Sequence, residues 1–385
     1  MLTSWAGRLA LGLALGALWR AGHRYAAAPL PGLVSWPVVR ATALAFCRRD
    51  RAAAPAPAVA AAYERRVATS VQLVARYVGT RLPQPLDKVH VLSRAGWIEA
   101  NLVGLRQLLD PLADASRAGE PKSVGNHASS GATQMLLSLQ LGVLLGFLAR
   151  RVLGQYDLAL LGSEPVVQGR LYFVEANIAA LEQRLGLPAE DFRLWIALHE
   201  TTHAFEFEAH PWLREHLAGL LRRYLQSLGP DVLSWRPTRA GQWAMLARLA
   251  GNALQSRYVV EIVMSPEQRE VFRAVQAAMA VLEGFSNHVM DRVGAGLIAD
   301  YPDLRARFER RLTERGLLER LAQQLTGLHV KLEQYVLGER FVNAVVERLG
   351  IAGANLLLSG PSALPTLDEL HEPQSWLARV PGAAP

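Results

Sequence analysis

The stretch that decides the fold runs from Phe192 to His203 and reads Phe-Arg-Leu-Trp-Ile-Ala-Leu-His-Glu-Thr-Thr-His. Its long apolar run predicts a largely buried helix from residue 191 to about 209, which should end before Pro211 because proline disfavours helical backbone in the residue that precedes it. On this helix His199 and His203 are four residues apart, so their imidazoles project about 40° apart around the axis. Two imidazoles on one helix face can share one metal ion.

Glu200 gives the pair of histidines a chemical purpose. It lies about 100° round the helix from His199, where it can reach a metal-bound water rather than the metal itself. Zinc lowers the pKa of such a water toward about 7, and Glu200 would take its proton as the general base. Polar groups on a buried helix are costly without partners or a metal. The H-E-x-x-H motif therefore predicts a Zn²⁺ site rather than an ordinary surface turn.

A zinc site of this kind needs a third protein ligand. The metzincin pattern would require histidine at position 209, where this chain has alanine, and His210 is one residue out of register. The gluzincin pattern takes a glutamate from a later helix, and Glu283 fits it, with Asn287 one turn on to hydrogen-bond a ligand histidine. Three other carboxylates stay open as ligands, as groups that orient a ligand, or as ordinary helix residues: Glu206, Glu261 and Asp291.

Outside the motif, the sequence predicts a mostly α chain of the α+β class. Alternating apolar and β-branched residues predict short strands at 88–92 and 170–175. Ser265-Pro266-Glu267-Gln268 combines an N-cap serine, a proline at the first helical position and a capping-box glutamine. The helix that carries Glu283 should therefore span 265–293. Apolar spacing predicts further helices at 58–80, 134–153, 177–185, 212–228, 302–315 and 317–349.

We expect three parts along the chain. Residues 1–57 form an N-terminal helical segment that ends in the sequence Ala-Pro-Ala-Pro. Residues 58–360 form the catalytic body with both metal-binding helices. Residues 361–385 are expected to be an irregular tail. Within the body, the polar, glycine-containing stretch 111–130 is expected to be a surface loop.

Composition limits the partners that this chain can have. It has 385 residues and a formal charge of +7, but the arginines are scattered among acids and leucines. No run of lysine and arginine with interleaved aromatics is present, so we expect no nucleic-acid partner. Cys47 is the single cysteine, which excludes an intrachain disulfide framework and a cysteine-rich metal site. A lone cysteine suits a reducing compartment.

Two apolar stretches were weighed as membrane segments. Leu9–Leu18 has only Arg8 before it, whereas a signal peptide carries its positive charge ahead of the apolar stretch. Met135–Ala149 contains Gln140 and two glycines. Both are shorter than the roughly 20 residues that span a bilayer. We therefore expect a soluble, cytoplasmic protein.

Several stretches spread over nearly the whole chain resemble a bacterial family of zincin-like hydrolases that is associated with deazaflavin-cofactor biosynthesis. These stretches are Gly96–Asn101, Val152–Asp157, Asn177–Ala180, Phe192–Leu217, Met264–Gln268, Leu282–Gly284, Val289–Asp291, Lys331–Tyr335 and Gly338–Phe341. The resemblance implies a zincin-like fold with a predominantly helical body and metal-dependent hydrolase chemistry.

This chain departs from that family at the third-ligand helix. The family reads E-G-H-x-D where this chain has Glu-Gly-Phe-Ser-Asn, so that Phe285 replaces a histidine and Asn287 replaces an acid. An amide can accept a hydrogen bond from an imidazole N–H but brings no negative charge, which lowers the basicity of the ligand. We expect the metal site to survive this change.

The reaction and the substrate are the least specified by the sequence. Tyr335 is our first candidate for the group that stabilises a tetrahedral oxyanion, ahead of Tyr258, His288, His329 and Arg340. One function class is a zinc metallohydrolase of peptide or small amide substrates. The other is a non-catalytic scaffold or binding protein that keeps a metal-stabilised zincin core. A Glu200 variant that retains zinc separates the two, because only the first class has turnover to lose.

Overall fold

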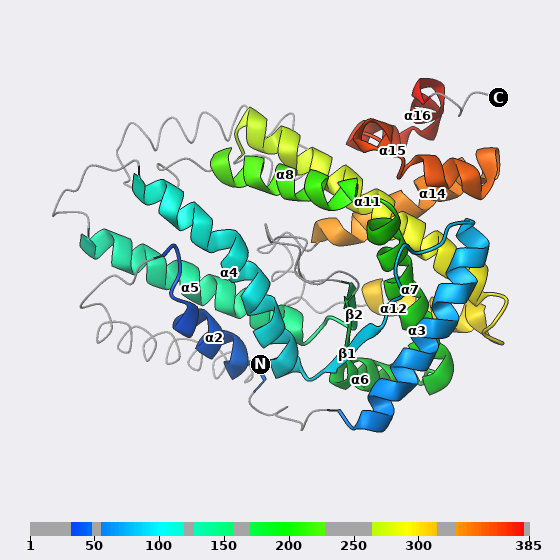
Figure 1. The fold of residues 1–385 in the computed structure, drawn as a ribbon, viewed down its shortest axis with the longest axis horizontal. Coiled ribbons are helices and arrows are strands. Elements are labelled where there is room, and N and C mark those ends of the chain that lie inside the picture. Colours follow the sequence, from blue (N-terminus) through cyan, green and yellow to red (C-terminus); the bar gives the residue numbers. More distant parts are fainter. Residues whose placement is uncertain are drawn as a thin grey trace, which may run out of the picture.

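The structure is a computed structural model and describes residues 32–47, 55–118, 127–156, 170–227, 264–313 and 329–380. Helices dominate it (Figure 1). The long ones are α3 (Pro57–Val78), α4 (Arg94–Ala118), α5 (His127–Ala149), α7 (Ala189–Ala209), α11 (Pro266–Gly294) and α14 (His329–Leu356). The shorter ones are α2 (Trp36–Ala45), α6 (Glu175–Leu185), α8 (Trp212–Ser227) and α12 (Tyr301–Thr313).

One small sheet lies among these helices. Strand β1 (Lys88–Leu92) pairs in parallel with β3 (Arg170–Val174), and β2 (Gly154–Tyr156) pairs antiparallel with the other side of β3. The predicted strands at 88–92 and 170–175 are confirmed. Strand β2 was not predicted, because a three-residue strand carries no periodicity and depends on its partner for its conformation.

The larger apolar core packs α3 and α7 against the sheet, α11 packs against both of these helices, and α14 packs against α3 and α11. Leu171 and Phe173 of β3 are completely buried in this core, and Phe173 stacks on Tyr63 of α3 with ring centroids 4.5 Å apart. Phe192 and Phe205 of α7 are buried in the same cluster. Helix α7 is therefore enclosed along most of its length, as its apolar sequence predicts.

The smaller apolar core is formed by α2, α4 and α5 (Figure 1). Asn177 joins it to the larger one. Its amide nitrogen donates to the carbonyl oxygens of Ala149 (2.8 Å) and Val152 (2.7 Å), and its amide oxygen accepts a bond from Arg94 (2.6 Å). These bonds fasten the C-terminal end of α5 and the start of α4 to α6.

Helices α11 and α14 cross at a pair of glycines. A Cβ atom on Gly338 would collide with the carbonyl oxygen of Ala280, and one on Gly284 would collide with the backbone of Gly338. Only glycine permits so close an approach of two helix backbones. Since Gly284 directly follows Glu283, this crossing also holds the predicted third ligand at a fixed position relative to α14.

The C-terminal region corrects one prediction. Residues 361–380 do not form an irregular tail but fold into a 3₁₀ turn (Pro361–Ala363), α15 (Leu367–His371) and α16 (Pro373–Arg379). Trp376 is completely buried against Phe341 of α14 and donates to the carbonyl oxygen of Ala363 at 2.7 Å. The signal was present in the sequence: Thr366 and Glu369 form a capping box.

The predicted loop at 111–130 is wrong at both ends, since α4 continues to Ala118 and α5 begins at His127. The run from 111 to 118 contains leucine and three alanines, which are strong helix formers. In contrast, the capping box at Ser265 and the helix that it starts are confirmed. The apolar stretch Leu9–Leu18 lies outside the described residues, and among the helices that are described none is both long and apolar enough to cross a bilayer.

Candidate metal centre

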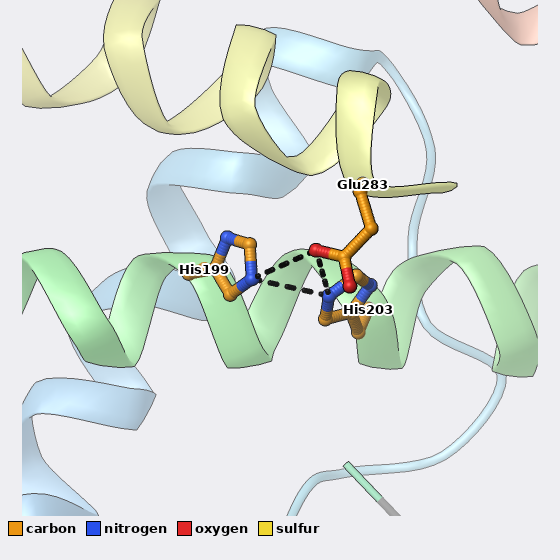
Figure 2. A group of neighbouring side chains, drawn as sticks. All are labelled: His199, His203 and Glu283. Atoms are coloured by element: carbon orange, nitrogen blue, oxygen red, sulfur yellow. Dashed lines mark hydrogen bonds and ion pairs between the residues drawn. The ribbon is translucent and has the colours of Figure 1, made fainter. Parts of the chain in front are cut away.

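Helix α7 brings the two motif histidines onto one face. Their imidazole rings lie edge to face, with centroids 4.7 Å apart, and their Nε2 atoms are 3.2 Å apart. Glu283 reaches the same point from α11, in the adjoining layer (Figure 2). Its Oε2 atom lies 3.6 Å from Nε2 of His199 and 3.8 Å from Nε2 of His203. Three donor atoms from two helices thus converge, all within 4.8 Å of one another.

This donor set suits a metal ion of the size and preference of zinc. Imidazole nitrogens and a carboxylate oxygen bind Zn²⁺ at about 2.0–2.2 Å, which separates tetrahedral ligands by about 3.3 Å. The observed separations of 3.2, 3.6 and 3.8 Å are close to that spacing. Glu283 is 4% exposed, so its carboxylate is also removed from competing water. The three residues could hold a metal ion and leave a fourth position for a water or a substrate.

A second carboxylate from α7 holds one of these histidines. Oε2 of Glu206 lies 2.7 Å from Nδ1 of His203, and the glutamate is completely buried. The hydroxyl of Ser286 lies 3.1 Å from the same nitrogen and donates to Oε1 of Glu206 at 3.2 Å. Glu206 therefore supports His203 in the way that Asn287 is predicted to support a ligand histidine. The residue of α11 that contacts His203 is Ser286, and the role of Asn287 stays a prediction.

The carboxylates around His203 change its protonation. Burial by itself would lower the pKa of this imidazole, but Glu206, with Glu283 and Glu200, outweighs burial and raises the pKa to about 9. Burial also raises the pKa of Glu206, and its pairing with His203 opposes that rise. Three carboxylates in one enclosed place thus favour an added positive charge, which a proton or a metal cation supplies.

Glu200 points toward the edge of the sheet. A Cβ atom on Gly154 of β2 would lie only 2.6 Å from Oε1 of Glu200, so a glycine is needed there to admit the carboxylate. Glu200 itself is 6% exposed. The role of Gly154 could not be predicted, because a glycine that ends a helix and one that clears space for a side chain look the same in sequence.

Two of the three rival ligands, Asp291 and Glu206, are among the described residues. Asp291 is paired with Arg305 and accepts a bond from Tyr301, both on α12 or at its start. His288, which was a candidate oxyanion stabiliser and not a ligand, is buried, with its ring nitrogens 2.7 Å from the Tyr77 hydroxyl and 2.6 Å from the amide oxygen of Asn343. Glu261 lies outside the described residues. Of the rivals, Glu206 alone touches a motif histidine, and it does so on the nitrogen away from Glu283.

The predicted oxyanion stabilisers are placed less fully. Tyr258 lies outside the described residues, and Arg340 is exposed. The backbones of Tyr335 and His329 belong to α14, whereas their side chains are not among those described. Tyr335 precedes Gly338 by one helical turn, and Gly338 lies against Gly284 beside the candidate ligand. The backbone therefore brings Tyr335 to the neighbourhood of the centre, and its role stays a prediction.

Comparison with known proteins now places the chain in a family. The model of the zincin-like metallopeptidase family matches residues 34–377, so the chain belongs to that family. It is also similar to a crystal structure from Chloroflexus aurantiacus described as "a putative hydrolase with a novel fold", with 37% sequence identity and a TM-score of 0.65. That match covers 90% of this chain and 98% of the other. No curated protein matches. The predicted family and the mostly helical zincin-like fold are confirmed.

Proposed function

We propose that this protein is a zinc-dependent metallohydrolase that cleaves peptide or small amide bonds. In this proposal His199, His203 and Glu283 hold Zn²⁺, and Glu200 is the general base. The observation that carries it is the convergence of three donor atoms within 4.8 Å beside a glutamate of the same H-E-x-x-H helix. Membership of a metallopeptidase family supports the choice of peptide and amide bonds.

Zinc, when bound, would polarise the scissile carbonyl and lower the pKa of a water molecule at the open fourth position. The proton transfers of the reaction would be carried out by Glu200. The Glu200 carboxylate would take a proton from the attacking water as the water oxygen bonds to the carbonyl carbon. The same carboxylic acid would then give that proton to the nitrogen of the leaving amine as the C–N bond breaks.

The surroundings of Glu200 support this role. Glu200 is 6% exposed, so its carboxylate is largely removed from bulk water. Gly154 leaves the carboxylate room at the edge of β2. A glutamate beside a candidate ligand histidine and next to the end strand of the described sheet could exchange protons with a substrate that lies along that strand.

Strand β2 also supports an extended peptide as substrate. In the sheet formed by the described residues it is an end strand, paired with β3 on one side. The main chain of an end strand can add an extended segment by hydrogen bonds that do not depend on sequence. A peptide bound next to Gly154 would pass directly by Glu200. This arrangement favours peptides over compact amides.

The test is Glu200→Gln in the zinc-loaded protein, screened with the wild type against a peptide library. The amide keeps the shape of the side chain but removes its basicity, so zinc content should stay at about one per chain while turnover falls at least about 10²-fold. Glu190→Gln is the matched control, because Glu190 begins the same helix and is exposed, paired with Arg66. Wild-type turnover in Glu200→Gln would refute the mechanism.

The alternative is a non-catalytic scaffold that keeps the zincin core. It is favoured by the departure at the third-ligand helix, where Phe285 and Asn287 replace the histidine and the acid that the family resemblance led us to expect. A zinc-loaded wild type that hydrolyses no library member, with partner binding unchanged in Glu200→Gln, would establish the scaffold instead.

A further inference from the structure

Glu206 is a buried carboxylate for which the proposed reaction has no use. It is completely buried in the larger core, where an ionised carboxylate is expensive unless it is paired and hydrogen-bonded. Both of its oxygens are satisfied by named partners. Oε2 lies 2.7 Å from Nδ1 of His203, and Oε1 accepts the hydroxyl proton of Ser286 at 3.2 Å. The free-energy cost of burying this carboxylate suggests that it has a function.

When Glu206 is ionised, the hydrogen bonds around it allow one consistent placement of protons. A carboxylate can only accept, so Nδ1 of His203 must carry the proton that points to Oε2. The hydroxyl proton of Ser286 goes to Oε1, which leaves the serine oxygen, 3.1 Å from Nδ1, as a weaker acceptor for the same N–H. With the proton fixed on Nδ1, the lone pair of a neutral His203 is on Nε2, the atom that faces Glu283.

Helices α11 and α7 each contribute one candidate ligand and one residue of the hydrogen-bonded group around Glu206. Glu283 and Ser286 are three residues apart on α11 and therefore share a face, one as candidate metal ligand and the other as the partner of Glu206. On α7, His203 and Glu206 are likewise three residues apart. One turn of α7 and one turn of α11 thus face each other. Glu206 on α7 contacts the ligand histidine, and Ser286 on α11 holds Glu206. His199, in the part of the chain that is described, interacts through Nε2.

We propose that Glu206, locked by Ser286, is the positioning residue of the metal centre: it fixes the tautomer and the ring orientation of His203 and raises the basicity of its Nε2. The inference rests on the proposed metal site and adds to it a carboxylate–histidine–metal relay in which the carboxylate comes from the motif helix itself. It also explains why Asn287 can be an amide, since the negative charge that supports a ligand histidine is supplied from α7.

The experiment compares Glu206→Gln, Ser286→Ala and Glu208→Gln with the wild type. Zinc affinity is measured by competition with a chelator, and the tautomer of His203 by imidazole ¹⁵N shifts of the zinc-loaded protein. Loss of an orienting carboxylate typically weakens a metal site about 10- to 100-fold. We expect that loss in Glu206→Gln, together with altered shifts of His203, and a smaller loss in Ser286→Ala.

Glu208→Gln is the matched control. Glu208 is two residues further along α7 and pairs with Arg214 and Tyr156 instead of a histidine. Its loss should change zinc affinity by less than about twofold, although it removes a partly buried carboxylate contact on the same helix. Unchanged affinity and unchanged His203 shifts in Glu206→Gln would overturn the positioning role. A wild type that binds no zinc would instead refute the proposed function, and Ser286→Ala keeps the inference testable if Glu206→Gln fails to fold.

Discussion

The two apolar cores of this protein differ in what they enclose besides apolar side chains. The smaller core, between α2, α4 and α5, encloses neutral polar groups, such as the Ser138 hydroxyl, which accepts a hydrogen bond from the Ser35 backbone N–H. The larger core encloses Glu200, Glu206 and Glu283, the carboxylate side chains that are less than one-tenth exposed among the described residues. An apolar sequence therefore does not distinguish the functional helices from the others. The buried carboxylates on α7 and α11 do distinguish them.

The comparison predicts that damage to the larger core reaches the metal centre. Trp376→Ala removes the largest completely buried side chain and leaves a cavity against Phe341. The free energy of unfolding should fall by about 3–5 kcal/mol, measured by urea denaturation. Trp376→Phe retains most of the ring and should cost much less. A negligible loss in Trp376→Ala would show that the C-terminal helices do not contribute to the stability of this core.

The glycine crossing should be the next most sensitive point. Gly338→Ala places a methyl group against the carbonyl of Ala280, and the overpacking should cost about 3 kcal/mol. Because α11 must shift, zinc affinity should fall as well. In Gly219→Ala, on α8, the new methyl meets no atom within 4 Å, and helix propensity alone should stabilise the protein by up to about 1 kcal/mol. A tolerated Gly338→Ala would contradict the close crossing.

Asn177 tests whether the two cores unfold together. Asn177→Ala leaves the carbonyls of Ala149 and Val152 and the guanidinium of Arg94 without their bonds to the amide, which should cost about 2 kcal/mol. We expect the urea transition to broaden or to separate into two steps, as followed by circular dichroism and by tryptophan fluorescence. A single sharp transition at an unchanged midpoint would mean that the junction lies elsewhere.

The smallest effect on the centre is expected from the smaller core. Gly146→Ala crowds the ring of Phe46 and the carbonyl of Ala43 where α5 meets α2. Stability should fall by about 1–2 kcal/mol, whereas zinc affinity should stay within about twofold of the wild type. Gly131→Ala, with open space around the new methyl, serves as its control. A large loss of zinc affinity in Gly146→Ala would abolish the distinction between the cores.

Much of the fold could be predicted because its signals are local. The capping box at Ser265 fixes where α11 begins, and the apolar run before His199 fixes α7. The strand at 88–92 follows from strict alternation. The capping box at Thr366 was equally local, so the error at the C-terminus was one of interpretation and not of missing information.

The candidate site was predictable where one helix supplies it and less so where two helices meet. His199 and His203 share a helix, so spacing alone places them together. The choice between Asn287 and Ser286 depends on how α11 is rotated about its axis against α7, which the glycine crossing with α14 helps to set. Gly154 is a tertiary neighbour of Glu200 across 46 positions of sequence, and no local pattern announces such a contact.

Because the candidate ligands are divided between α7 and α11, the stability of the folded protein should depend on the concentration of free metal. An ion that binds His199, His203 and Glu283 joins segments 80 residues apart in the sequence, and the unfolded chain offers no comparable site. Each tenfold rise of free zinc above the dissociation constant then adds about 1.4 kcal/mol to the folded state. The ion would act as a reversible crosslink, and the cell could set the lifetime of the protein through the concentration of free zinc.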